Sequence, residues 1–107
     1  MRDLLFGARI VDAAERAGAT VRTIAAPAEL PPVSDVELLL VDWNDREADW
    51  GPQLAAWRPA GGGGTPRLVL FGSHTDVDAH AEAKRHGIGP VMARSRFVEI
   101  LPRLFAA

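Results

Sequence analysis

The stretch Val36-Glu-Leu-Leu-Leu-Val-Asp42 is a nearly continuous apolar run that ends in an aspartate. Parallel strands that are covered on both faces have this pattern, whereas strands with one face in water alternate apolar and polar residues. We therefore expect residues 36–41 to form a strand at the centre of a parallel sheet. It should be the most buried strand of the fold.

Other apolar runs and helical patterns alternate along the chain on both sides of this strand. Helical spacing or capping residues predict helices over residues 3–17, 52–57 and 73–86 and from Ser95 onward. Short β-branched or apolar runs predict further strands over residues 20–24, 67–71 and 91–93. The alternation predicts an α/β fold with an open parallel sheet of about four strands, flanked by helices and joined by right-handed crossovers.

Length and composition exclude several classes of protein. A chain of 107 residues is the size of one domain, which we expect to span residues 1–107. The net charge of −2 gives no excess of cations for nucleic acids, and no apolar run approaches the roughly 20 residues that cross a bilayer. The sequence has no cysteine, which excludes disulfides and thiolate chemistry. We expect a cytoplasmic protein with neither nucleic-acid nor membrane partners.

Polar residues that could form a site follow three of the predicted strands. In open parallel sheets, ligands bind beyond the carboxyl ends of the strands. These ends are expected at residues 42–45, 72–75 and 94–96.

These three segments resemble the receiver domains of bacterial response regulators in two-component signalling. Leu39-Leu-Val-Asp-Trp-Asn44 resembles the strand that carries the phosphoacceptor aspartate, Phe71-Gly-Ser73 the strand that ends in a switch hydroxyl, and Arg94-Ser95 the lysine-proline pair. The resemblance covers nearly all of the chain from Asp3 onward and implies a flavodoxin-like (CheY-like) fold. It implies Asp42 as phosphoacceptor, Ser73 as switch residue, Arg94 as phosphate ligand and Asp3 as a partner for Mg²⁺.

The chain also departs from the receiver pattern. Receivers begin with an apolar strand that leads into two acidic residues, whereas this sequence offers at most Asp3 as a match, and Arg94 replaces the lysine. Phosphoryl transfer depends on positioning and charge neutralisation, and one acidic partner beside Asp42 makes a weak Mg²⁺ site. We therefore expect a degenerate receiver, or pseudo-receiver, that is not an enzyme, needs no cofactor and works as an interaction or dimerisation module.

Two alternatives to this expectation stay open. In the first, the chain is a single-domain response regulator that accepts a phosphoryl group on Asp42 with Mg²⁺ as cofactor. In the second, it is a flavodoxin-like domain that binds a small molecule in an apolar pocket beside Gly72 and the glycine loop of residues 61–64.

The missing first strand predicts a homodimer. In receivers that strand is an interior one, so residues 20–24 would slide next to residues 36–41 and expose a new sheet edge with little protection against pairing. Two such edges would meet across a two-fold axis. Alternatively, residues 1–6 form the missing strand, with the helix starting near Gly7, and the monomer is complete.

Two further groups of residues are candidates for a partner surface or a metal site: the tryptophans and a string of histidines and aspartates. Trp43 and Trp50 are expected in loops and are candidates for a partner surface, whereas Trp57 should pack against the sheet. The string His74-x-Asp76-x-Asp78-x-His80 has the wrong helical spacing for a metal site, and its carboxylates suit capping of a helix. We therefore expect no metal there.

Overall fold

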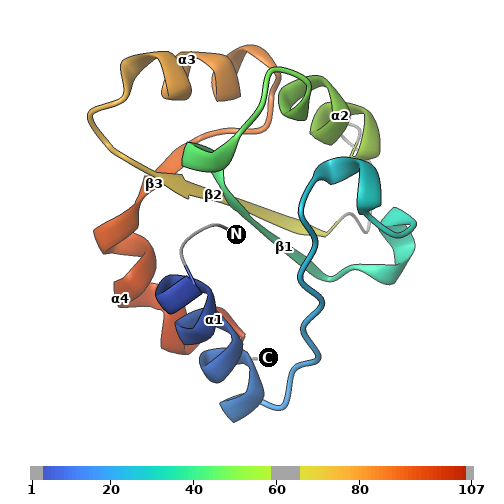
Figure 1. The fold of residues 1–107 in the computed structure, drawn as a ribbon, viewed down its shortest axis with the longest axis vertical. Helices are drawn as coiled ribbons and strands as arrows, with labels where there is room; N and C mark the ends of the chain where they lie inside the picture. The colour runs from blue at the N-terminus through green and yellow to red at the C-terminus, as the bar shows by residue number, and fades with distance from the viewer. Residues whose placement is uncertain (1–3, 59–65, 106–107) are drawn as a thin grey trace.

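The computed structural model describes residues 4–58 and 66–105. It has a mixed α/β architecture, with an open parallel sheet flanked by helices (Figure 1). The helices are α1 (Leu4–Arg16), α2 (Trp50–Trp57), α3 (Val77–Arg85) and α4 (Arg94–Leu104), and the strands are β1 (Leu38–Asp42), β2 (Arg67–Gly72) and β3 (Val91–Ala93). Three short 3-10 turns are η1 (Pro27–Glu29), η2 (Val33–Asp35) and η3 (Trp43–Asp45).

The strands lie in the order β1-β2-β3, and both pairings are parallel. The register pairs Asp42 with Phe71 and Gly72 with Ala93, so the carboxyl ends of all three strands meet at one end of the sheet. Within the described ranges β2 is the central strand, and β1 and β3 are the edges.

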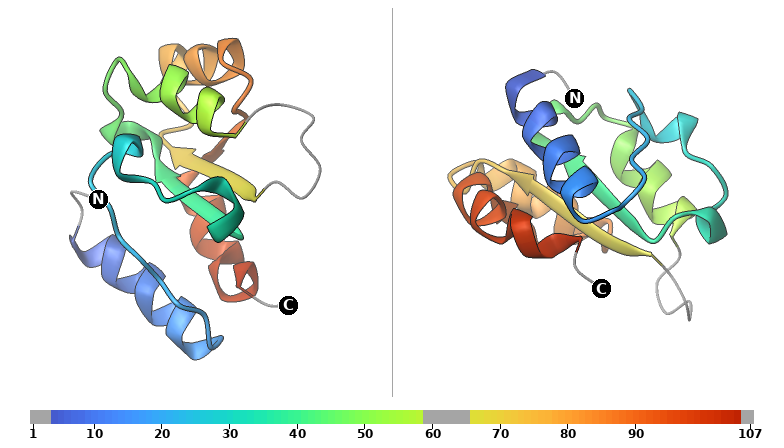
Figure 2. Two further views of the ribbon diagram at one scale, coloured as in Figure 1. Left: turned by 90° about the vertical axis from the view of Figure 1, so that its right-hand side faces the viewer. Right: turned by 90° about the horizontal axis from the view of Figure 1, so that it is seen from below.

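Helices cover both faces of this sheet, α1 and α4 on one face and α2 and α3 on the other (Figures 1 and 2). Successive side chains of a strand point to opposite faces, so Leu70 packs in the cluster under α2 and α3 while Phe71 packs under α1 and α4. Phe71 and Phe97 are fully buried and their rings stack with centroids 4.2 Å apart. The sheet is therefore the middle of three layers, with an apolar cluster on each side.

Helix α3 ends where its sequence signals predict but begins one turn later. Asp76 caps the helix by accepting a hydrogen bond from the backbone N–H of Ala79 at 3.0 Å, and Gly87, with φ of +72°, follows its last turn. The helix therefore starts at Val77, and the expected start at Ser73 is wrong. Ser73 lies one turn earlier, in the loop after β2.

The sheet differs from the expected one in its size and in the place of β1. The expected strand over residues 20–24 is extended backbone that pairs with no described strand, so the described sheet has three strands rather than about four. Consequently β1 is an edge, and the expectation of a most buried central strand is wrong: Leu38, Leu39 and Leu40 are only half-buried. A strand forms only beside a partner, and residues 20–24 have no described partner, whereas β1 is paired on one side with β2.

The start of α1 contradicts part of the alternative in which residues 1–6 form a first strand. Helix α1 begins at Leu4, so residues 4–6 are helical and do not belong to a first strand. Residues 1–3 lie outside the described residues, as does the glycine run of residues 61–64. Within the described part of the chain, no helix has the length and apolar character needed to cross a membrane.

Candidate functional site

The candidate site lies at the carboxyl end of the sheet, where β1, β2 and β3 end side by side. Asp42 is the last residue of β1, Ser73 directly follows β2, and Arg94 directly follows β3. The expectation that these three segments meet is confirmed. The remaining residue of the predicted set, Asp3, lies outside the described residues.

Asp42 and Arg94 form the central contact of this site. Nη2 of Arg94 donates to Oδ2 of Asp42 at 2.8 Å, and Oδ1 of Asp42 accepts the backbone N–H of Asn44 at 3.1 Å. The carboxylate is buried, with only 4% of the side chain exposed, whereas the Arg94 side chain is 36% exposed. Both oxygens of Asp42 are therefore engaged, one by a cation and one by the turn η3.

The surroundings of Asp42 disfavour its charge in spite of the arginine. Burial away from water, followed by the negative charge of Asp45, raises the pKa of Asp42 above its ordinary value, while Arg94 and the N–H of Asn44 act in the opposite direction. Arg94 thus offsets only part of the unfavourable free energy of an ionised carboxylate at this position.

Asn44 joins β1 to β2 at the same end of the sheet. Its Oδ1 accepts the backbone N–H of Ser73 at 3.1 Å, and it lies so close to Gly72 that a Cβ there would be 2.7 Å from Oδ1. Asn44 and Arg94 together tie the end of β1 to the ends of β2 and β3. This role of Asn44 was not predicted, although the sequence places its side-chain amide two residues after a predicted strand end.

Replacing Gly72 by alanine should therefore weaken the site. The new Cβ displaces the amide of Asn44 and breaks its bond to Ser73, which should lower the free energy of unfolding by about 1–3 kcal/mol. Denaturant unfolding measures the change. In an Asn44→Ala background the same substitution should have a much smaller effect, and an equal loss in both backgrounds would show that Asn44 is not what the Cβ meets.

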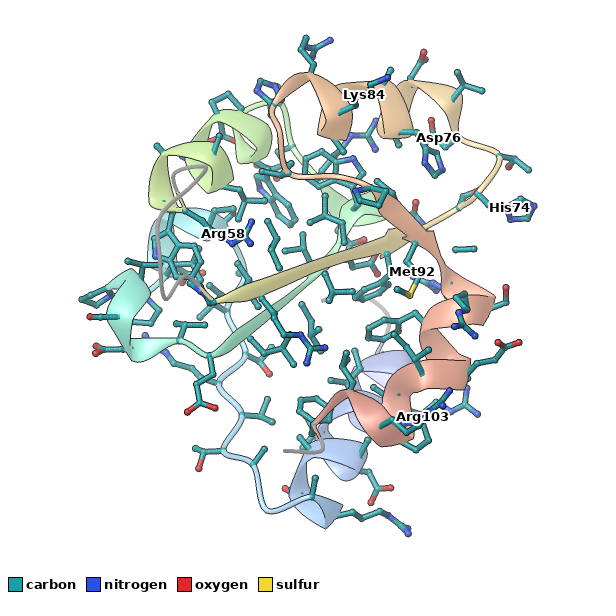
Figure 3. All side chains as sticks on the ribbon, turned by 180° about the vertical axis from the view of Figure 1, so that it is seen from behind. Arg58, His74, Asp76, Lys84, Met92 and Arg103 are labelled. Atoms are coloured by element: carbon teal, nitrogen blue, oxygen red, sulfur yellow. The ribbon has the colours of Figure 1, made fainter. Side chains whose placement is uncertain are left out.

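The other predicted residues of this region make contacts within their own loop and with the start of α3. Oγ of Ser73 lies 2.9 Å from Oγ1 of Thr75, within the loop that leads to α3. His74 points away from the molecule in that loop, while Asp76 caps α3 as expected (Figure 3). Within residues 4–58 and 66–105, no three His, Cys, Asp or Glu side chains come together as a metal site would require.

Trp43 is not a partner surface, and that prediction is wrong. Its side chain is fully buried, and its Nε1 donates to the carbonyl oxygen of Ala79 at 2.9 Å. Arg46 lies over the ring, 5.5 Å from its centroid, and its Nε donates to Oε2 of Glu82 at 2.6 Å. The turn η3 folds the indole back under α3, which a loop position in the sequence does not reveal.

The other two tryptophans lie in α2. Trp50 is its first residue, not a loop residue, and is half-buried against the cluster under α2 and α3. Trp57 is half-buried too, and its Nε1 donates to the carbonyl oxygen of Pro31 at 2.8 Å. Trp50 therefore exposes part of its side chain, which keeps it a candidate for contact with a partner.

A hollow of about 520 Å³ lies on another part of the surface, between α3 and the loop that precedes β3. It is lined by His80, Lys84, Gly87, Gly89, Pro90 and Val91. This is the amino end of β3, whereas the small-molecule alternative requires an apolar pocket beside Gly72 and the glycine loop, and that loop lies outside the described residues. The hollow therefore gives that alternative no support.

Comparisons with known proteins leave the family open. No protein-family model matches this chain, and searches of curated proteins and of solved structures also gave no match. Function is therefore inferred from the contacts among Asp42, Asn44, Ser73 and Arg94.

Proposed function

We propose that this chain is a degenerate, flavodoxin-like (CheY-like) receiver that acts as an interaction and dimerisation module in bacterial-type signalling and is not phosphorylated. The observation that carries the proposal is the pairing of buried Asp42 with Arg94 at 2.8 Å. The residue at the phosphoacceptor position of the resemblance is used to hold strand ends together. We propose no catalytic step and no cofactor.

The geometry of Asp42 favours this structural role over phosphoryl transfer. An acceptor oxygen must be open to an in-line phosphoryl donor and must lie beside a metal ion that neutralises the developing charge. Here Oδ2 is bound by Arg94 and Oδ1 by the backbone of Asn44. A donor would have to displace the arginine from a carboxylate that is almost fully shielded from water.

We expect no phosphorylation of Asp42. After incubation with acetyl phosphate and Mg²⁺, intact-protein mass spectrometry should show the unmodified mass for both the wild type and Asp42→Asn. A gain of one phosphoryl group that is present in the wild type and absent in Asp42→Asn would sink the proposal.

That outcome would favour the second candidate function, a single-domain response regulator that is phosphorylated on Asp42. The specific observation in its favour is the location of Arg94 and Ser73 at the same end of the sheet, where they could bind the phosphate and respond to it. Asp3 would then be expected to help bind Mg²⁺. Beryllofluoride with Mg²⁺ tests this candidate, because it should raise the melting temperature only if the site is competent.

The proposed dimerisation rests on the edge of β1 that pairs with no described strand. β1 pairs only with β2 among the described strands, although its sequence has the apolar pattern of a strand with neighbours on both sides. Natural sheets rarely leave such an edge uncovered. We propose a homodimer as the functional form and expect it in the cytoplasm, without nucleic-acid or membrane partners.

A further inference from the structure

The open edge of β1 has a definite hydrogen-bonding pattern. The backbone N–H of Arg67 donates to the carbonyl oxygen of Glu37 at 3.0 Å, so Glu37 directs its carbonyl toward β2. Successive residues of a strand direct their N–H and C=O groups to opposite sides. The N–H and C=O groups of Leu38, Leu40 and Asp42 therefore point away from β2, toward the edge.

Nothing in the sequence of β1 protects this edge. Edge strands are usually protected by lysine, proline, a bulge or an inward-pointing charge. β1 reads Leu-Leu-Leu-Val-Asp, and its only charged side chain, Asp42, is buried and paired with Arg94. Leu38 and Leu40 pack toward the α1 and α4 layer and Leu39 toward the α2 and α3 layer, and all three are half-buried. A neighbouring strand would complete the burial on both faces.

Residues 20–24 lie on this side of β1 but do not pair with it. In Figures 1 and 2 the segment between α1 and η1 runs past β1 on the side opposite to β2. No described hydrogen bond joins it to β1, and residues 20–23 are exposed, Val21 by 37%. Little therefore holds the segment in place, and a partner that needs the edge can displace it.

We propose that the β1 edges of two copies of this chain pair antiparallel across a two-fold axis at Leu40. The inference rests on the proposed dimerisation function and assigns its surface. Leu40 is the middle residue of β1, so this register gives the longest overlap, with Leu40 opposite its copy and Leu38 opposite the partner's Asp42. All of the outward backbone groups then find partners.

The electrostatics of this register favour a second copy as the occupant. Both Asp42 carboxylates lie at opposite ends of the paired strands, each beside its own Arg94, so like charges do not face each other. A strand that pairs with itself presents the same pattern of donors and acceptors from both sides. Such isologous contacts are the commonest form among homo-oligomers.

Single cysteines in a chain that has none test the proposal. Residues opposite each other in a hydrogen-bonded antiparallel pair have Cα atoms about 5.5 Å apart, within the range that a disulfide spans. Leu40→Cys should therefore give a disulfide-linked dimer under mild oxidation. Leu38→Cys is the matched control, because it is a half-buried leucine of the same face and strand. In the proposed register the two introduced thiols of that control are about 13 Å apart along the strand, too far for a disulfide.

The measurements are static light scattering of the wild type and non-reducing gels of both variants, with circular dichroism to confirm that each variant is folded. We expect a wild-type mass near twice 11.5 kDa and a cross-linked fraction about tenfold higher for Leu40→Cys than for Leu38→Cys. If the wild type is dimeric but the two folded variants cross-link equally or not at all, the dimer does not form through β1. The proposed dimerisation function would still hold. A mass near 11.5 kDa at all concentrations overturns both the β1 interface and the dimerisation function, and is the result expected if residues 20–24 pair with their own β1.

Discussion

Trp43→Ala should bring the domain close to unfolding at room temperature. Trp43 is fully buried between β1 and α3, and large-to-small changes at such positions cost about 3–5 kcal/mol. The carbonyl of Ala79 also loses its indole partner but keeps its helical one within α3, so this lost hydrogen bond adds about 0.5–1.5 kcal/mol. Against a total stability of about 5–15 kcal/mol, the loss is a large fraction. Thermal unfolding followed by circular dichroism measures it.

Two tryptophan variants separate the causes of this loss. Trp43→Phe keeps most of the apolar volume but removes the indole N–H, so it should cost clearly less than Trp43→Ala. Trp50→Ala is the matched control, because Trp50 is half-buried at the start of α2, and it should cost about 1–2 kcal/mol. If Trp50→Ala destabilised the fold as much as Trp43→Ala, the anchoring role of Trp43 would be wrong.

The three strands could be predicted from the sequence, because a local pattern of apolar residues marks each of them. The apolar run that ends in Asp42, the run before Gly72 and the short run before Arg94 each predict a strand, and each is one. Parallel strands bring their carboxyl ends together, so the meeting of Asp42 with Arg94 follows from local pattern and one topological rule.

The features that the sequence did not reveal depend on neighbours. Leu38 to Leu40 have the composition of a central strand, but a central place requires a second strand beside them, and residues 20–24 do not pair there. Trp43 follows a strand in a polar segment, and only the position of α3 above η3 decides that its ring is buried. In both cases the deciding contact comes from a segment distant in the chain.

The proposed function rests on the ion pair of Arg94 with Asp42, and Arg94→Met should have the second large effect. It leaves the carboxylate of Asp42 buried without its cation. Removing one partner of a fully buried pair costs about 3–5 kcal/mol, and the 36% exposure of the Arg94 side chain reduces this to about 2–4 kcal/mol through screening by water. Chemical denaturation at pH 7 measures the loss. Arg94→Lys, which keeps a cation, should recover part of it.

The dependence of this loss on pH identifies Asp42 as its cause. Burial and Asp45 raise the folded-state pKa of Asp42 above the unfolded value of about 3.9, so the folded state binds the proton more tightly. Asp42 therefore favours the folded state below the unfolded pKa, and this contribution is lost as the pH rises through the folded pKa. Without Arg94, which lowers this pKa, the folded value rises further and the loss extends to higher pH.

The difference in stability between the wild type and Arg94→Met should therefore be largest at neutral pH and shrink as the pH falls toward 4. Taking the difference removes the acid effects that both proteins share. The double variant Asp42→Asn, Arg94→Met has no buried carboxylate at this position, so it should be more stable than Arg94→Met at pH 7 and should show little of this pH dependence. A loss for Arg94→Met that stays constant from pH 7 to pH 4 would mean that Arg94 stabilises the fold through packing alone. The ion pair with Asp42 would then no longer support the proposed function.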